Sequence, residues 1–192
     1  MTWYVIDGMD GSGKTTSSDI VREHLQASGR KVLEITHPNT NCLAGRMAAK
    51  ALRIPGKLGE LLTTLLYILD VLHSLNYKKW HQKDYDDVIF VRYSMAAAYV
   101  PESMCRTVYR MIEAVLPVPD VKIFVDIDPQ IAMKRILDRG EELEIFETDE
   151  KLNSTRRRML SIADTWHVVD NSGTVENTRH QTLAVLEEVG AR

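Results

Sequence analysis

Gly8-Met9-Asp10-Gly11-Ser12-Gly13-Lys14-Thr15 is the most informative segment of this 192-residue chain. It follows the apolar stretch Trp3–Asp7 and leads into a helical pattern that begins at Thr15. An apolar strand, the pattern G-x-x-x-x-G-K-[ST] and a helix, in that order, are typical of a phosphate-binding P-loop. An ordinary glycine-rich turn is the alternative, but the position directly after the first strand disfavours it. The segment therefore predicts binding of a nucleoside triphosphate.

The chemistry of the loop follows from its residue types. Glycines let the backbone curl so that successive N–H groups point into one concavity, and the next helix adds the positive end of its dipole. Lys14 can reach the outer phosphates, and the Thr15 hydroxyl can ligate Mg²⁺. We therefore expect ATP and Mg²⁺ as cofactors. The candidate phosphate-binding residues are Gly8, Asp10, Gly11, Ser12, Gly13, Lys14, Thr15 and Thr16.

Composition narrows the class of protein. The length fits a single domain over residues 1–192, and a net charge of -3 gives no bulk attraction to nucleic acid or membranes. No apolar run approaches the roughly 20 residues of a membrane span. The chain starts directly with a strand pattern, so no signal peptide is expected. Cys42 and Cys105 lack metal or redox spacing. These features predict a soluble, cytoplasmic protein.

Apolar, β-branched stretches alternate with helical patterns along the chain. Near-continuous apolar strands separated by helices indicate a parallel sheet covered on both faces. The sequence therefore predicts an α/β P-loop NTPase fold with a five-stranded parallel sheet and a small lid. The expected strands are Trp3–Asp7, Lys31–Ile35, Val88–Arg92, Val121–Asp126 and His167–Asp170. The expected helices cover 15–28, 43–53, 58–80, 101–115, 129–138, 149–164 and 175–189.

Four further motifs extend this pattern. They are R-Y and A-Y at Arg92-Tyr93 and Ala98-Tyr99, D-x-D-P-x-x-A-x-x-R from Asp126 to Arg135, Arg139-Gly140, and V-D-x-S at Val169–Ser172. Together with I-D-G-x-D-G-S-G-K-T-T at Ile6–Thr16, they make nearly the whole chain resemble the thymidylate kinase family of P-loop nucleoside monophosphate kinases. The P-loop alone is shared by many NTPases. Asp10, the R-Y segment and D-x-D-P make the resemblance much more specific.

The resemblance implies transfer of the ATP γ-phosphoryl group to a nucleoside monophosphate, with dTMP as the expected acceptor. Arg92 would hold the acceptor phosphate, because a planar guanidinium suits a phosphate. Asp10 would accept a hydrogen bond from the 3′-hydroxyl of the acceptor sugar. Tyr67 would stack on the base and Tyr99 would contact the sugar or base. The catalytic candidates are Lys14, Arg92 and Arg139, with a lid around residues 139–150, and relatives suggest a homodimer.

Each of these roles has a structural alternative. Asp10 is also compatible with a solvated loop carboxylate, and Arg92 with a structural ion pair at the end of a strand. Tyr67 and Tyr99 are equally compatible with aromatic packing in the core. Arg156-Arg157-Arg158 could supply a cation to the site, although a solvated helix face is the better interpretation of that run.

The chain also departs from the family pattern. Val91 replaces the acid of D-R-Y, and Val71 replaces an Arg that reads thymine in the family. His37 replaces an acid before Pro, and Ile145 stands where a lid Arg is usual. Asp138–Glu150 is strongly acidic, which leaves Arg135 and Arg139 as candidate cations.

Two alternatives to a dTMP kinase follow from these departures. One is a nucleotide-binding regulatory or interaction module that has lost turnover, and the other is a kinase for a different nucleoside monophosphate. The intact P-loop, Asp10 and Arg92 favour catalysis. A GTPase is disfavoured because the chain lacks an N-K-x-D segment.

Overall fold

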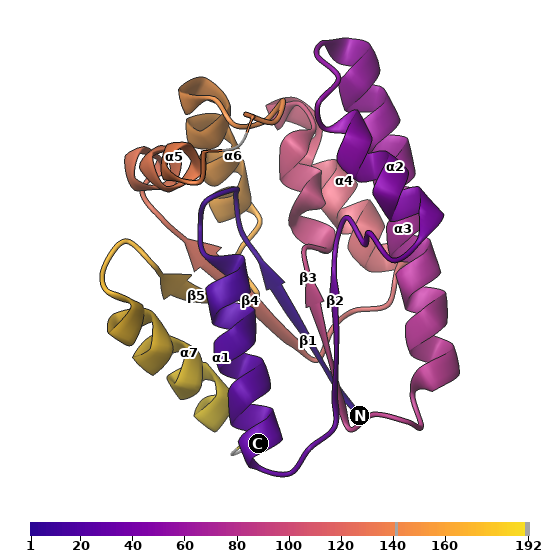
Figure 1. Cartoon of the computed structure of the whole chain (residues 1–192), viewed down its shortest axis with the longest axis vertical. Coiled ribbons are helices and arrows are strands. Elements are labelled where there is room, and N and C mark those ends of the chain that lie inside the picture. The colour runs from indigo at the N-terminus through magenta and orange to yellow at the C-terminus, as the bar shows by residue number, and fades with distance from the viewer. Residues whose placement is uncertain (141, 191–192) are drawn as a thin grey trace.

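The computed structural model describes residues 1–140 and 142–190. Five strands form one parallel sheet in the order β2-β3-β1-β4-β5. The predicted α/β fold with a five-stranded parallel sheet is confirmed. All strands end at the same edge of the sheet, where the P-loop joins β1 to α1 (Figure 1). The strands are β1 (Thr2–Asp7), β2 (Val32–Thr36), β3 (Asp87–Val91), β4 (Val121–Asp126) and β5 (His167–Asp170).

Helices cover both faces of this sheet. One face carries α1 and α7, which pack against each other, and the opposite face carries α3, α4 and α6 (Figure 1). A 3-10 helix, η1, follows β3, and α2 packs against α3. The helical elements are α1 (Lys14–Ala27), α2 (Leu43–Ala51), α3 (Lys57–His81), η1 (Ser94–Tyr99), α4 (Glu102–Val115), α5 (Pro129–Asp138), α6 (Asp149–Ser161) and α7 (Val175–Gly190).

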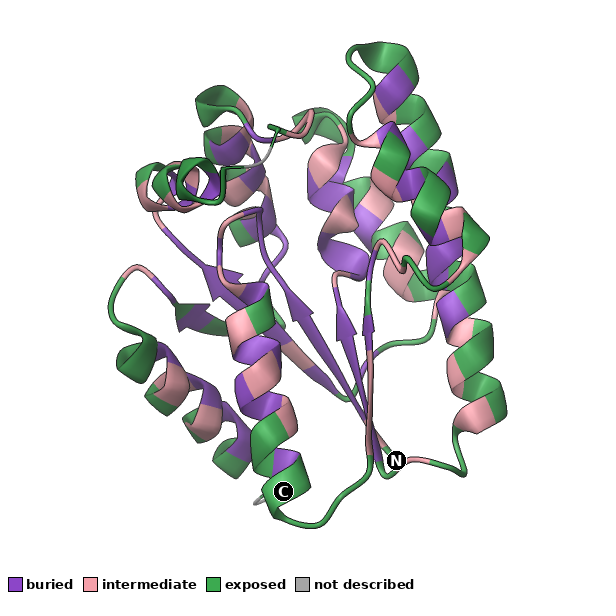
Figure 2. Cartoon of the chain, in the orientation of Figure 1, coloured by how far each residue is buried: buried purple, intermediate pink, exposed green. Residues whose placement is uncertain are grey.

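The period-two alternation of β1 distributes its side chains between two cores. Trp3 and Val5 pack into the cluster beneath α3 and α4, whereas Tyr4 and Ile6 pack into the cluster beneath α1 and α7. The central strands are therefore buried on both sides along nearly their whole length (Figure 2). This explains why their sequences are almost continuously apolar.

Most element boundaries agree with the prediction to within one or two residues, and two differences concern the site. β3 ends at Val91 instead of Arg92, because Arg92 adopts a left-handed backbone with φ of 68°. The short helix η1 was not predicted, since six residues are too few for helical periodicity to be read. α5 begins as expected, with Pro129 in its first turn and Asp128 as its N-cap.

Helix α3 differs from the expectation that no stretch is long enough to span a membrane. Its 25 residues are long and apolar enough to do so by length and composition alone. One face of α3 nevertheless belongs to the protein interior, where Thr63, Asp70 and Ser74 are buried. The opposite face is apolar and exposed.

Candidate functional site

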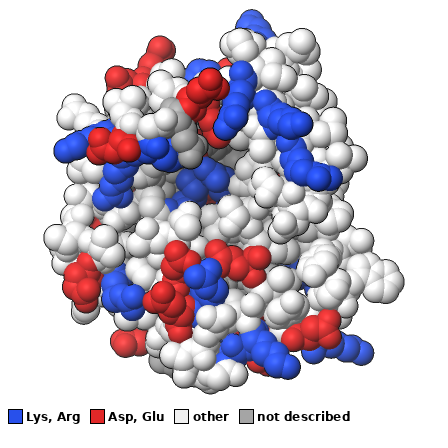
Figure 3. Space-filling view, viewed as in Figure 1, with Lys and Arg blue, Asp and Glu red and all other residues white. Residues whose placement is uncertain are grey.

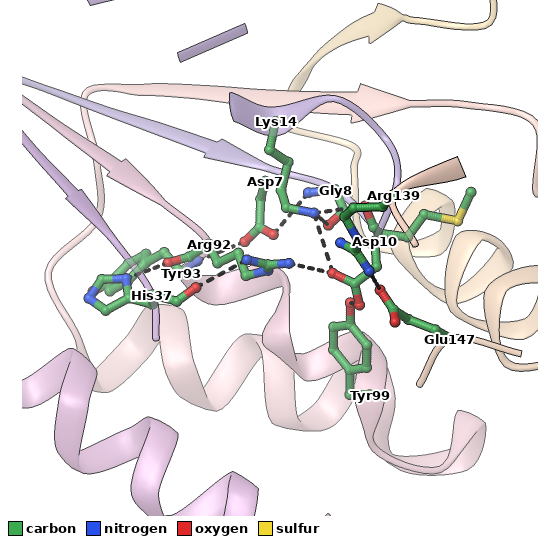
Figure 4. A network of polar contacts seen from close by, with 11 residues as sticks. Asp7, Gly8, Asp10, Lys14, His37, Arg92, Tyr93, Tyr99, Arg139 and Glu147 are labelled. Atoms are coloured by element: carbon green, nitrogen blue, oxygen red, sulfur yellow. Dashed lines mark hydrogen bonds and ion pairs between the residues drawn. The ribbon is translucent and has the colours of Figure 1, made fainter. Parts of the chain in front are cut away.

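The side chain of Lys14 lies across the P-loop. Its ammonium donates to the carbonyl oxygens of Gly8 at 2.9 Å and Met9 at 2.7 Å, and lies 3.8 Å from Asp10 Oδ1 (Figure 4). Burial and the nearby charge of Arg92 lower the pKa of Lys14 to about 8, against the attraction of Asp10. A phosphate at this position would favour the charged form.

Two glycines let the loop lie close to its neighbours. Gly11 and Gly13 have φ values of 73° and 92°, which L side chains rarely adopt. A Cβ on Gly11 would lie 2.7 Å from the Ala132 carbonyl oxygen, and one on Gly13 would lie 2.1 Å from Asn171 Nδ2. The loop therefore needs glycine at both positions to pack against α5 and the turn after β5.

Asn171 fixes the loop from behind. Its Nδ2 donates to the Ser12 carbonyl oxygen at 2.7 Å, and its Oδ1 accepts from Thr178 at 2.6 Å. The sequence placed Asn171 within the V-D-x-S motif but assigned it no role. Ser12 itself is buried, whereas Thr15 is exposed and Thr16 half-buried in the first turn of α1.

Asp10 and Arg92 join the P-loop to the end of β3. The Arg92 guanidinium forms an ion pair with Asp10, and the Tyr99 hydroxyl lies 3.4 Å from Asp10 Oδ2 (Figure 4). Burial favours a neutral Asp10, but Arg92 and Lys14 outweigh it and hold the Asp10 pKa at about 2. Although burial opposes its charge, Arg92 has a pKa raised above its ordinary value by Asp10. Asp10 is not a solvated loop carboxylate, because it is 7% exposed.

The left-handed backbone of Arg92 is held by two neighbours. The ring nitrogen Nδ1 of His37 lies 2.8 Å from the Arg92 carbonyl oxygen, and Arg92 Nη1 donates to the His37 carbonyl oxygen at 3.2 Å. The buried carboxylate of Asp7 accepts hydrogen bonds from the N–H groups of Tyr93 at 2.8 Å and Met95 at 3.2 Å. Such a conformation is uncommon for a long side chain and persists where neighbours determine it.

A cavity of about 140 Å³ opens from the Asp10–Arg92 pair between α3, η1 and the segment before α6. Tyr67 lines it and donates from its hydroxyl to the Tyr93 carbonyl oxygen at 3.3 Å. Tyr67 and Tyr99 are therefore half-buried at a cavity wall, with core side chains behind them. The lining residues are Asp7, Asp10, Pro38, Leu52, Thr63, Thr64, Tyr67, Arg92, Ala96, Tyr99, Val100, Glu144 and Phe146.

The acidic segment expected to form a lid contributes a wall of this cavity. The Ile145 N–H donates to the Leu52 carbonyl oxygen at 3.0 Å, and the ring of Phe146 packs 4.7 Å from that of Tyr99. Arg139 donates to the buried carboxylate of Glu147 at 2.6 Å. Residue 141, within the expected lid of 139–150, lies outside the described residues.

Three carboxylates meet beside these arginines. Ligand oxygens of Asp10, Glu144 and Glu147 lie within 4.8 Å of one another. Burial raises the pKa of Glu144, and the charges of Asp10 and Glu147 raise it further. Lys and Arg side chains gather in a hollow of the visible face, with acidic side chains on its upper rim (Figure 3). Glu144 and Glu147 were read only as part of an acidic run.

The remaining basic residues separate into different roles. Arg135 donates to the Asn171 carbonyl oxygen at 3.1 Å, and its guanidinium would lie 3.6 Å from a Cβ on Gly13. Interpreting Arg156–Arg158 as a solvated face was wrong for two of its members. Arg156 binds Asp126 through two hydrogen bonds of 2.8 Å, and Arg158 donates to the Ala98 carbonyl oxygen. Periodicity could not reveal these partners, which lie far away in the sequence.

Two of the departures from the family pattern are buried in the core. Val71 packs in the cluster beneath α3, and Val91 packs in the cluster beneath α1, with exposed fractions of 4% and 1%. Among the described residues that line the cavity, Val71 is absent. Val71 and Val91 therefore cannot supply the charges that the family pattern has at these two positions.

A known protein family and several known proteins match this chain along most of its length. The family model described as thymidylate kinase matches residues 6–182. A probable thymidylate kinase of Archaeoglobus fulgidus is 29% identical over 185 residues, which cover 95% of this chain and 93% of that protein. The thymidylate kinase of Thermosipho africanus is 26% identical and covers 95% of this chain and 96% of its own length.

A solved structure shares the fold. The thymidylate kinase of Candida albicans superposes with a TM-score of 0.76 at 19% identity, covering 97% of this chain and 91% of its own. At this identity the likeness concerns the fold alone, whereas the family model spans most of the sequence. The chain belongs to the thymidylate kinase family and is a nucleoside monophosphate kinase.

Proposed function

We propose that this chain transfers the γ-phosphoryl group of ATP to dTMP, giving dTDP and ADP. The observation that carries the proposal is the position of Asp10, which belongs to the P-loop, lines the acceptor cavity and pairs with Arg92. A donor phosphate held by the loop and an acceptor phosphate held by Arg92 would therefore meet at one point. Phosphoryl transfer depends mainly on such alignment and on cations that stabilise spread negative charge.

On the donor side, the loop N–H groups and the start of α1 would hold the phosphates, and Lys14 would exchange its contacts with Gly8 and Met9 for phosphate oxygens. The exposed Thr15 hydroxyl would ligate Mg²⁺, which prefers oxygen ligands. When bound, Mg²⁺ would neutralise charge on the phosphates.

On the acceptor side, Arg92 would bind the phosphate and Asp10 would accept the 3′-hydroxyl of the sugar. The Tyr67 ring lines the cavity and offers a surface for a base to stack on. Tyr99 keeps Asp10 in place through its hydroxyl and would contact the sugar. Arg139, held beside the site by Glu147, is the proposed cation for the transferring group.

We further propose a cytoplasmic homodimer that forms through the exposed face of α3. The apolar residues of this face recur at spacings of three and four, so they form one stripe along the helix. Each of them is at least 37% exposed. They are Leu58, Leu61, Leu62, Leu65, Ile68, Leu69 and Leu72.

The dimer is tested by light scattering after size-exclusion chromatography. The double variant Leu65→Glu/Leu69→Glu should run as a monomer, because burying two carboxylates in an apolar interface is costly. Lys79→Glu, a charge change at an exposed position of the same helix, is the matched control and should remain a dimer. A wild-type monomer at micromolar concentration would remove the proposal.

The kinase activity is tested by coupled ADP release with dTMP, dUMP, UMP, CMP, GMP and AMP as acceptors. We expect turnover with dTMP. Lys14→Ala should abolish turnover, and Arg92→Ala should raise the KM for the acceptor more than the KM for ATP. ATP binding without turnover on any acceptor would overturn the proposal and favour a binding module. Unchanged acceptor kinetics in Arg92→Ala would refute its assignment to the acceptor phosphate.

A further inference from the structure

The polar groups that line the acceptor cavity fall into two sets. One set lies at the P-loop end and is joined by hydrogen bonds and ion pairs among its members or to nearby backbone: Asp7, Asp10, Tyr67, Arg92 and Tyr99. The other set, Thr63, Thr64 and Glu144, lies outside this network. The remaining lining is apolar. A nucleobase in this cavity would therefore find few groups able to read its edge.

Thr63 is the unusual member of the second set. It is 7% exposed, and its hydroxyl has no hydrogen-bond partner among the described residues. Its neighbour Thr64 instead donates to the Glu60 carbonyl oxygen at 2.8 Å, the usual arrangement for threonine inside a helix. A buried hydroxyl without a partner is destabilising, so its persistence in a cavity wall suggests that a ligand completes it.

The position of Thr63 relative to Tyr67 supports a role at the base. The two residues are four apart on α3, so their side chains share one face of the helix, and both line the cavity. Val71 lies four residues beyond Tyr67 in the opposite direction and is buried in the core. One turn after Tyr67, α3 therefore offers no polar group to a base, whereas one turn before Tyr67 it carries the hydroxyl of Thr63.

We propose that Thr63 is a specificity-determining residue whose hydroxyl hydrogen-bonds the edge of the acceptor base. The proposal rests on the proposed function, because it takes the cavity to be the site of a nucleoside monophosphate. A hydroxyl can donate to a carbonyl or accept from an amino group, so Thr63 serves either kind of pyrimidine edge. An arginine, which only donates, would restrict the site to bases with a carbonyl group.

The test compares Thr63→Val, which removes the hydroxyl at constant shape, with Thr63→Ser, which keeps it. We expect Thr63→Val to lower kcat/KM for dTMP by roughly three- to tenfold, the usual worth of one neutral hydrogen bond. The loss should appear in the acceptor KM of dTMP and dCMP, be smaller for the purine acceptors GMP and AMP, and leave the ATP KM unchanged. Thr63→Ser should restore both.

Thermal unfolding separates this role from a structural one. Because the hydroxyl is unpaired without acceptor, Thr63→Val should have an equal or higher Tm than wild type while it binds acceptor more weakly. Thr182→Val is the matched control, since the buried hydroxyl of Thr182, in α7, also has no hydrogen-bond partner in the part of the chain that the structure describes. It should equal or raise the Tm and leave acceptor kinetics unchanged.

Three results would overturn the proposal. They are unchanged acceptor selectivity in Thr63→Val, an equal loss on every acceptor, and a lowered Tm that accounts for the lost activity. If wild type turns over no acceptor, the proposed function fails instead. Calorimetric binding of dTMP to wild type, Thr63→Val and Thr63→Ser then decides the role of Thr63, and equal affinities would refute it.

Discussion

Replacing Asp10 with asparagine tests the electrostatic arrangement at the centre of the site. The Asp10 carboxylate lies between two buried cations, with Arg92 paired to it and the Lys14 ammonium 3.8 Å away. Asparagine keeps the shape of the side chain and removes its charge. The two cations then repel each other without a counter-charge, so we expect the folded state to lose stability.

The magnitude follows from the pKa of Asp10. Its value of about 2 lies below the ordinary value of 3.8, and one pKa unit corresponds to about 1.36 kcal/mol. The charge of Asp10 therefore contributes about 2 kcal/mol to the free energy of unfolding. Because the folded pKa is depressed, this contribution is complete above pH 3.8 and disappears as the pH falls through about 2.

Urea denaturation at pH 7 measures this contribution. Asp10→Asn should lower the free energy of unfolding by about 2 kcal/mol with an unchanged m-value. Asp84→Asn, which removes a charge from an exposed aspartate, is the matched control and should change stability by less than about 0.5 kcal/mol. If Asp10→Asn also changed the free energy of unfolding by less than about 0.5 kcal/mol, the argument would be refuted. Solvent would then already screen the charges of Asp10, Arg92 and Lys14.

Two further predictions concern pH. A bound phosphate favours the charged form of Lys14, whose pKa is about 8, so ATP affinity measured by calorimetry should fall as the pH rises through about 8. Lys14→Ala should lose this dependence, and a flat wild-type profile would contradict it. Burial lowers the pKa of His37 below 6.5, against the carboxylate of Asp70 and together with the charge of Arg92. The unfolded chain therefore takes up the proton first, and wild type should lose stability as the pH falls below about 6.5. Urea denaturation at pH 7.5 and 5.5 should show a larger loss of stability for wild type than for His37→Gln. Equal pH dependence in the two proteins would refute this.

The fold was predictable because burial on both faces leaves a continuous apolar signal in each central strand. The boundaries of the strands were harder to predict, because polar residues at strand ends have partners that are distant in sequence. Asp87 begins β3 although it is charged, since Arg30, 57 residues away, binds its carboxylate through two hydrogen bonds. A pattern of local hydrophobicity cannot anticipate such a pair.

The strand, loop and helix of the P-loop were predictable because their residues are contiguous. The cavity proposed for the acceptor assembles from α3, η1 and the segment before α6, and its contacts join residues that are far apart in sequence. The N–H of Ile145 binds the carbonyl of Leu52, for example, which makes the acidic segment a wall of the cavity. Only the tertiary fold could reveal that Thr63 and Glu144 line the same space.

The loss of the family's acid at Val91 raises the question of how Arg92 keeps its position. Ile6 and Val91 are register partners in the sheet, so Asp7 at the end of β1 lies beside the turn that follows β3. The Asp7 carboxylate binds the N–H groups of Tyr93 and Met95, and His37 binds the Arg92 carbonyl oxygen. Arg92 is therefore fixed from both neighbouring strands, by groups that do not include the side chain of residue 91. An acid at that position is not required to aim the guanidinium at Asp10, which supports the proposed role of Arg92 as the cation for the acceptor phosphate.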